Sequence, residues 1–457
     1  RPVCYLTFHA HHLLGGLRPP PMRAVNIAIH IAASLLLLGL LTRMLRQARA
    51  PALPESSVRF IAGLGALLFA FHPMQTESVT YIVQRFTSLG TFFLLLTLHL
   101  HLRSLDAPRR AVRIAARIGS VAALLLGMGT KEFLVTAPLL VVLADVLVRG
   151  SPVRVALRRA WPHLLCLPVL PVMVVLTSWA QSGGDASLGT ALNVAAPIGS
   201  PPEFALQYAL TQPGVVVAYL RLLLMPVALN LDHDVTACTS ALAPGFWAPL
   251  AGLAALGILA VLWRQCDALA ARGSLSLFGV LWFFLTIGVD SSVVPLPDLM
   301  SEHRTYLPSI GLFIALACLL DDLRLRLSDR RFLRHAVPAL AGAWLVVLGG
   351  LTVARNRIWR SESVMWADVV TKSPIKARAW MNLGVALSDE GRADQGIECL
   401  RRALSVNPSA LLVYINLCRL QCRTGRFDDA LATIQAGLAQ SPGRSEEHTS
   451  ELQSRQS

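Results

Sequence analysis

A chain of 457 residues could hold about two to four soluble domains, but hydrophobic residues make up 54% of it and charged residues only 15%. A soluble fold of this size could not bury so much apolar surface, and so few charges could not cover it. The same figures exclude a disordered chain, a collagen-like chain and a disulfide-stabilised scaffold. The composition therefore predicts an all-α protein that crosses a membrane several times.

The chain is also basic, with 41 Lys and Arg against 27 Asp and Glu and a net charge of +14. In a membrane protein, such an excess collects in the cytoplasmic loops. We therefore expect a lipid bilayer around the chain and no nucleic-acid partner. The eight cysteines show no pairing framework, and we expect them to be free thiols.

Apolar runs recur along the chain, and a spanning helix needs about 20 residues. Several runs are shorter, so their helices should extend into the flanking polar residues. The runs cover residues 24–41, 60–71, 86–102, 118–128, 133–148, 161–180, 204–224, 246–263, 277–289, 307–320 and 337–353.

Arginines collect in the loops after alternate runs, and these loops should be cytoplasmic. The arginines are Arg43, Arg46, Arg49, Arg59, Arg103, Arg109, Arg110, Arg113, Arg117, Arg149, Arg154, Arg158, Arg159, Arg264, Arg272, Arg324, Arg326, Arg330, Arg331 and Arg334. The run at 204–224 then cannot be a single crossing, and we expect Gln212-Pro213-Gly214 to interrupt it. We predict about ten crossings of an inner or plasma membrane, with residues 1–23 and those after about 354 on the non-cytoplasmic side.

A 34-residue period follows the last apolar run. Trp380 recurs as Tyr414, and Pro408 recurs as Pro442. Large residues fill the first helix of each unit, small residues stand where the second helix approaches, and proline closes the unit. The pattern is typical of two tetratricopeptide repeats over residues 376–442. Two repeats are too few to stand alone, because each buries its face on a neighbour.

The chain thus divides into a polytopic membrane domain over residues 1–354, an interfacial linker over 355–375 and the repeats over 376–442. Residues 443–457 contain the string RSEEHTSELQS, which looks like the translation of a sequencing adapter, and we expect no fold from them. The chain opens at Arg1, without Met or a signal peptide, and we expect it to be truncated there.

Polar clusters should lie at the non-cytoplasmic ends of the spans, where charged groups are costly and indicate function. In the first, an amphipathic helix over 72–85 would place Glu77 and Arg85 on one face in the membrane interface. The others contain Lys131 and Glu132, then Asp232, His233 and Asp234, and then Asp298 with Glu302, His303 and Arg304.

Basic groups and carboxylates around one outward-facing cavity would suit an anionic lipid headgroup. Arginine binds phosphate through two parallel hydrogen bonds, and carboxylates can orient or deprotonate an acceptor. We expect Arg85 and Arg304 to share this cavity. The alternative for Lys131–Glu132, and for Asn26–His30 inside the first run, is ion pairing or helix capping. The alternative for Asp232–Asp234 is a divalent cation; otherwise no cofactor or metal is expected.

Several motifs together resemble one family, over about residues 1–442. They are Arg1-Pro2, the HPxxTE segment from His72 to Glu77, Lys131-Glu132, Asp232-His233, the EHRxYLP segment from Glu302 to Pro308, and the repeats. The family comprises the transmembrane and tetratricopeptide-repeat O-mannosyltransferase-like proteins, which belong to the GT-C membrane glycosyltransferases. The resemblance implies that a polyprenyl-phosphate sugar donates a hexose at the outer face, and that the repeats present a protein acceptor.

The family's catalytic acidic pair lies in the first outer loop, before the Arg-Pro at which this chain begins. The resemblance therefore leaves the catalytic residues unassigned and implies a donor site. The residues expected in that site are Arg304, His303, Glu302, Arg85, Glu77, His72, Lys131 and Asp232.

Two other functions compete with a glycosyltransferase. A non-catalytic membrane scaffold would bind a protein partner through its repeats, but it needs no clustered charges at one membrane face. A transporter of lipid-linked sugars should show an internal duplication of its spans, and the sequence shows none.

Overall fold

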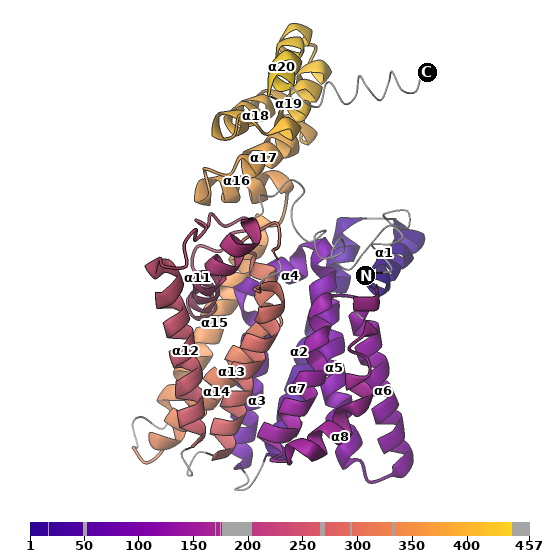
Figure 1. Cartoon of the computed structure of the whole chain (residues 1–457), viewed down its shortest axis with the longest axis vertical. Helices are drawn as coiled ribbons and strands as arrows, with labels where there is room; N and C mark the ends of the chain where they lie inside the picture. Colours follow the sequence, from indigo (N-terminus) through magenta and orange to yellow (C-terminus); the bar gives the residue numbers. More distant parts are fainter. Residues whose placement is uncertain are drawn as a thin grey trace. The chain divides into compact units, whose positions relative to one another are not determined.

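The computed structural model of the chain describes residues 1–440, apart from residues 17, 49–52, 170, 174, 176–202, 266–269, 293–294, 331–332 and 334. The regular structure of these residues is helical, as the composition predicts. Their contacts define two units (Figure 1). The membrane unit comprises Arg1–Leu229 and Thr236–Arg355, and the repeat unit comprises Asn230–Val235 and Asn356–Ser457.

The membrane unit consists of long helices joined by short helical turns. In chain order they are α1 (Pro2–Gly15), α2 (Pro19–Arg46), α3 (Glu55–Phe71), η1 (Pro73–Gln75), α4 (Thr76–Thr80), η2 (Ile82–Gln84), α5 (Arg85–Asp106), α6 (Arg110–Met128), η3 (Glu132–Thr136), α7 (Ala137–Leu143), η4 (Ala144–Val148), α8 (Val153–Leu164), α11 (Phe204–Leu224), α12 (Pro244–Arg264), α13 (Ala270–Asp290), η6 (Glu302–Thr305), α14 (Pro308–Arg326) and α15 (Ala336–Ile358).

Six helices among the described residues are long and apolar enough to cross a membrane: α2, η2 with α5, α6, α12, α13 and α15. The pair α3 and η1–α4, bent by 51°, would make a seventh span. The runs at 133–148, 204–224 and 307–320 are also largely helical but do not belong to this set. Parts of the run at 161–180 lie outside the described residues. About ten crossings therefore remains a prediction.

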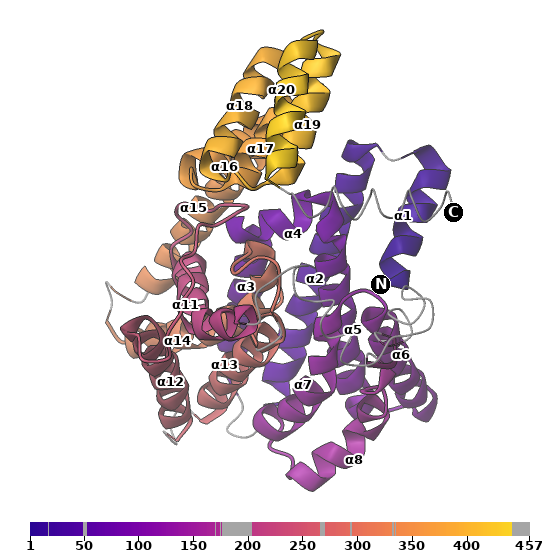
Figure 2. The same ribbon diagram turned by 45° about the horizontal axis from the view of Figure 1, so that its top comes forward.

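Close backbone packing joins α13 to α14, which run side by side (Figures 1 and 2). Gly279 and Gly311 face each other at this contact, and a Cβ on either residue would overlap the carbonyl oxygen of the other. Small residues let membrane helices approach closely and gain dispersion energy along their length. This packing places the segment between the two helices, which includes η6, at one end of the unit.

The single amphipathic helix expected over residues 72–85 is wrong. The chain forms η1, α4 and η2 in succession, with extended backbone at Tyr81 (φ −75°, ψ 107°) before α5 begins. A continuous helix would have placed Glu77 and Arg85 on one face. The break at Tyr81 removes that relation, and the two side chains contact different parts of the unit.

The interruption expected at Gln212-Pro213-Gly214 is also wrong, because α11 continues through Pro213. A proline removes one backbone donor, which a helix in a membrane protein tolerates when neighbouring groups compensate. Polar side chains beside the proline bind other segments: Thr211 Oγ1 accepts a hydrogen bond from Cys238 N at 2.8 Å.

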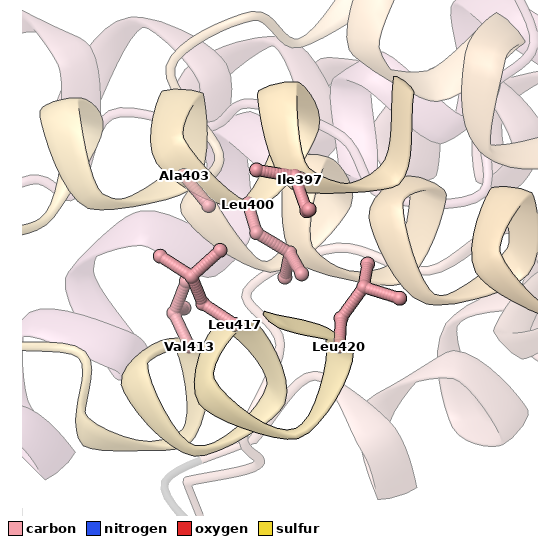
Figure 3. Close-up of a cluster of buried hydrophobic side chains, with 6 residues drawn as sticks. All are labelled: Ile397, Leu400, Ala403, Val413, Leu417 and Leu420. Atoms are coloured by element: carbon pink, nitrogen blue, oxygen red, sulfur yellow. The ribbon is translucent and has the colours of Figure 1, made fainter. Parts of the chain in front are cut away.

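The repeat unit contains two helical hairpins preceded by one helix. The helices are α16 (Glu362–Lys372), α17 (Ala377–Asp389), α18 (Ala393–Val406), α19 (Leu411–Arg423) and α20 (Phe427–Ala439). Gly391 and Gly425, 34 positions apart, turn the chain with φ of 81° and 76°, a conformation that favours glycine. Six apolar side chains between α18 and α19 join the hairpins (Figure 3): Ile397, Leu400, Ala403, Val413, Leu417 and Leu420.

Much of the expected interfacial linker is part of this unit. Ser361 caps α16 by accepting a hydrogen bond from Val364 N at 3.3 Å, and Val369 and Val370 of α16 pack into one cluster with Leu383 of α17. α16 thus covers the apolar face of α17 in the first hairpin, which would otherwise have no neighbour on that side. Residues 443–457 lie outside the described part of the chain.

Candidate functional site

A histidine and a glutamate from distant segments form a short polar contact at the α4 end of the membrane unit. His303 of η6 places Nδ1 2.6 Å from Glu77 Oε1, and its backbone N–H donates to Glu77 Oε2 at 3.1 Å. The Glu77 side chain is 3% exposed and that of His303 is 19% exposed. Both carboxylate oxygens thus fix the position and the orientation of one imidazole ring.

The protonation state of His303 follows from its surroundings. Burial lowers the pKa of His303 well below its usual range, and the cations Lys131 and Arg304 lower it further. The neutral ring keeps one N–H, and its Nδ1–H can donate to the Glu77 carboxylate. Nε2, which makes no hydrogen bond to the described residues, then carries a lone pair. The pair can therefore accept a hydrogen bond from a hydroxyl group.

Arg304 adds a buried positive charge beside this pair. Its guanidinium donates to the Tyr208 hydroxyl at 3.2 Å and to the backbone carbonyls of Asp298 at 2.8 Å and Leu299 at 3.5 Å. These are neutral acceptors, and no carboxylate among the described residues lies within 4.0 Å of the guanidinium. The carboxylates of Asp290 and Asp298 stabilise this charge from farther away, and an anion in direct contact with the guanidinium would stabilise it more.

Lys131, in the loop after α6, is a second buried cation. Its Nζ donates to Thr87 Oγ1 at 2.8 Å and lies 5.6 Å from the centre of the Phe133 ring. Burial lowers the pKa of Lys131 below its usual value. The adjacent Glu132 binds Arg1 instead, at 2.8 Å, with both side chains 42% exposed. The structure therefore shows no internal Lys131–Glu132 ion pair.

Arg85 lies in a different environment. It is fully buried, and it donates to Asn26 Oδ1 at 2.7 Å, to the Met22 carbonyl at 3.1 Å and to Thr7 Oγ1 at 3.3 Å, with its guanidinium 4.4 Å from the centre of the Phe8 ring. These contacts join α5 to α1 and α2. Arg85 and Arg304 share no partner, so the expected convergence of the two guanidinium groups is not what the contacts show.

His72 is committed to the fold. Its Nδ1 accepts a hydrogen bond from Met74 N at 3.3 Å, and its Nε2 lies 3.1 Å from the Leu223 carbonyl. Both ring nitrogens thus hold the turn after α3 against α11. Glu302 begins η6 and is 1% exposed, so it is placed next to His303 but inside the protein.

Asp232 belongs to the repeat unit and not to the membrane unit that holds the other expected residues. Its carboxylate binds Arg378 at 2.8 Å and Lys376 at 3.4 Å, and its carbonyl accepts a hydrogen bond from Ser373 Oγ at 2.8 Å. Two cations on one carboxylate oppose the binding of a divalent cation there. No group of three or more His, Cys, Asp or Glu side chains among the described residues is arranged to hold a metal ion.

Two tyrosines of α11 contribute to the site, although neither is among the site residues expected from the sequence. Tyr208 binds Arg304, and the Tyr219 hydroxyl accepts from Ser301 N at 2.8 Å and lies 2.9 Å from the Ser301 carbonyl. The two residues are eleven positions apart, which is close to three helical turns. That spacing, with Gln212 between them, is the signal of a polar stripe on one face of the helix.

Known proteins match most of the chain, including the segments that form the site. The family model of the tetratricopeptide repeat matches residues 368–450. Protein O-mannosyl-transferase Tmtc3 of Drosophila melanogaster is 25% identical over 95% of this chain and 51% of its own length. Protein O-mannosyl-transferase TMTC4 of Homo sapiens is 26% identical over 87% of this chain and 56% of its own length.

The expected resemblance to the transmembrane and tetratricopeptide-repeat O-mannosyltransferase-like family is confirmed. A shorter match of higher identity is to Protein O-mannosyl-transferase Tmtc2 of Drosophila melanogaster, which is 30% identical over 62% of this chain and 27% of its own length. The chain spans about half the length of the first two relatives. The alignment with Tmtc3 covers 95% of this chain and therefore includes parts of both units.

Proposed function

We propose that this protein is a GT-C-type membrane glycosyltransferase. It transfers a hexose, by likeness to its relatives a mannose, from a polyprenyl phosphate to a hydroxyl group of a protein at the non-cytoplasmic face. Support comes from the relatives, whose names describe protein O-mannosyl transfer. The observation that carries the proposal is the arrangement of Arg304, Lys131 and the Glu77–His303 pair.

The two cations suit the phosphate of the donor. Both are buried, and their hydrogen-bond acceptors among the described residues are neutral, while the Asp290 carboxylate acts on both charges from farther away. A lipid-linked phosphate would supply a negative charge in direct contact with the cations, and Arg304 could bind two of its oxygens through parallel N–H groups. Lys131 would act as a point charge.

In the transfer step, the acceptor oxygen forms a bond to the anomeric carbon, and the bond from that carbon to the phosphate oxygen breaks. The electron pair of the broken bond leaves with the polyprenyl phosphate, and the hydroxyl proton passes to a base. Arg304 and Lys131 would stabilise the negative charge that grows on the leaving phosphate. His303 Nε2 would accept a hydrogen bond from a substrate hydroxyl, and Glu77 would position the ring.

The test is donor binding to the purified protein carrying Arg304→Ala, Arg304→Lys or the matched control Arg154→Ala. Removing a charged hydrogen bond costs about 1.5–3 kcal/mol, so Arg304→Ala should weaken binding of a polyprenyl-phosphate mannose roughly 10- to 150-fold. Lysine keeps the charge but loses the paired donors, so Arg304→Lys should also bind less tightly. Arg154 is exposed on α8, and its loss should leave binding unchanged. Unchanged donor affinity in a folded Arg304→Ala protein refutes the phosphate role.

A non-catalytic scaffold is the second candidate, and the repeats favour it. The repeat unit contains a hollow of about 230 Å³ lined by Asp389, Asn416, Arg419 and Arg423, which suits polar groups of a protein partner. If the protein is a scaffold only, Asn416→Ala with Arg419→Ala should abolish partner binding, and donor binding should be absent from the wild type. In the glycosyltransferase, the same double variant should reduce transfer to protein but leave donor affinity intact.

A further inference from the structure

A second basic region lies at the opposite end of α6 from Lys131. A hollow of about 350 Å³ is bounded there by α5, α6 and α8, and its lining includes His101, Ser104, Arg110, Arg113, Arg117 and Arg159. α6 ends at Met128 and the lining reaches along it as far as Arg117, so the two regions are separated by about 17 Å at 1.5 Å per residue. The hollow is therefore distinct from the proposed donor site.

The positive charge of this hollow exceeds the negative charge that faces it. Among the described residues, no carboxylate pairs with Arg110, Arg113 or Arg117. Arg117 lies instead 5.8 Å from the centre of the Trp161 ring. The nearby carboxylate, Asp145, is fully buried and is shared by Arg159 at 3.6 Å, Arg149 at 3.4 Å and His101 at 3.8 Å.

The position of two of these arginines adds to the excess of positive charge around the hollow. Arg110 and Arg113 stand in the first turn of α6, which contains no acidic residue. The amino-terminal end of a helix carries a partial positive charge and favours anions. The positive charges of Arg110 and Arg113 repel the partial positive charge of this helix end. An anion between the two arginines and the backbone N–H groups would remove that repulsion.

The residues around the hollow indicate where the anion comes from. On α6, Ile114 is 49% exposed and Ile118 is 65% exposed, and on α8 Trp161 is 54% exposed. Exposed aliphatic side chains one and two turns after Arg110, next to Arg113 and Arg117 in the chain, suit lipid chains, and tryptophan is enriched at the membrane–water interface. The side chains around the hollow therefore suit a charged headgroup that carries acyl chains.

We propose that this hollow binds the phosphate of an anionic membrane lipid, with Arg110, Arg113 and Arg117 around the headgroup. The lipid's acyl chains lie along Ile114 and Ile118, next to Trp161. Basic hollows between membrane helices are suited to such headgroups. The lipid neutralises the arginines and joins α5, α6 and α8.

The experiment uses the full chain in nanodiscs that contain phosphatidylglycerol or phosphatidylcholine with brominated acyl chains, which quench tryptophan fluorescence on contact. The Trp161 signal is the difference between the wild type and Trp161→Phe. It should be quenched at a lower mole fraction of brominated phosphatidylglycerol than of brominated phosphatidylcholine. Arg110→Gln with Arg113→Gln should weaken this preference roughly ten- to thirty-fold.

The matched control is Arg154→Gln with Arg158→Gln, which removes the same charge from exposed positions of α8 and should keep the preference. If the glutamine pair does not fold, Arg110→Lys with Arg113→Lys keeps the charge and should retain part of the preference. Equal quenching by the two lipids refutes the proposal, and so does an equal loss in both glutamine pairs. Inorganic phosphate should not reverse the quenching at millimolar concentration; reversal would identify a site for free phosphate instead.

Discussion

Buried polar residues of the membrane unit find partners far away in the sequence. Glu77 and His303 are 226 positions apart, and His30 Nδ1 binds the Tyr306 hydroxyl at 2.7 Å across 276 positions. Asn26, expected to pair with His30, binds Arg85 instead. A buried polar group left unpaired is costly, so each such contact both orients a side chain and fixes two helices together.

Arg85 should matter for stability and not for donor binding. Arg85→Ala would leave the acceptors on Asn26, Met22 and Thr7 unpaired inside the protein, at a cost of about 3 kcal/mol. Thermal unfolding in detergent should show a clear loss of stability, whereas Arg103→Ala, at an exposed position of the same helix, should change it by less than about 0.5 kcal/mol. A stable Arg85→Ala protein with weakened donor binding would show instead that Arg85 takes part in donor binding.

His303 should make the stability depend on pH. Its pKa is well below 6.5 in the folded protein and about 6.5 when unfolded. Below pH 6.5 the unfolded chain therefore binds more protons, so this contribution is complete above about pH 6.5 and is lost as the pH falls. The wild type should lose more stability between pH 7.5 and 5.5 than His303→Gln does, as measured by thermal unfolding. Equal losses would show that His303 does not titrate in this range.

Close helix packing determines the arrangement of the elements. Gly279 and Gly311 bring α13 and α14 together in the membrane unit. In the repeat unit, Gly384 and Gly396 do the same for α17 and α18, where a Cβ on Gly384 would lie 2.8 Å from the Gly396 carbonyl oxygen. Both units thus use glycine where two helix backbones meet.

Gly311→Ala should separate α13 from α14. The added methyl group would overlap the Gly279 carbonyl, and overpacking of this kind costs about 1–3 kcal/mol. Because η6 follows α13 and precedes α14, donor binding should fall together with the melting temperature. Gly252→Ala on α12, where nothing lies within 4 Å of the new Cβ, should be neutral or slightly stabilising. If both variants melt alike, the glycine contact does not hold the helices.

At the scale of the whole molecule, the alternation of arginine-rich loops predicts that the repeats lie on the non-cytoplasmic side. In sealed vesicles with the cytoplasmic face outward, Ser409→Cys should react with an impermeant thiol reagent only after detergent is added. Arg154→Cys should react before. Cys422 is exposed and is replaced by serine in the parent protein. Labelling of Ser409→Cys in intact vesicles, with protection of Arg154→Cys, would invert the topology.

Local patterns determined the membrane class, the helical fold and the repeats, because hydrophobicity, helical periodicity and a 34-residue period are properties of neighbouring residues. The same patterns brought Glu77, Lys131, His303 and Arg304 together as candidates. Only the tertiary structure decided that the break at Tyr81 sends Arg85 toward Asn26, and that Asp232 packs with the repeats. Both outcomes depend on one backbone angle and on contacts more than 50 positions apart, which no pattern within a single helix contains.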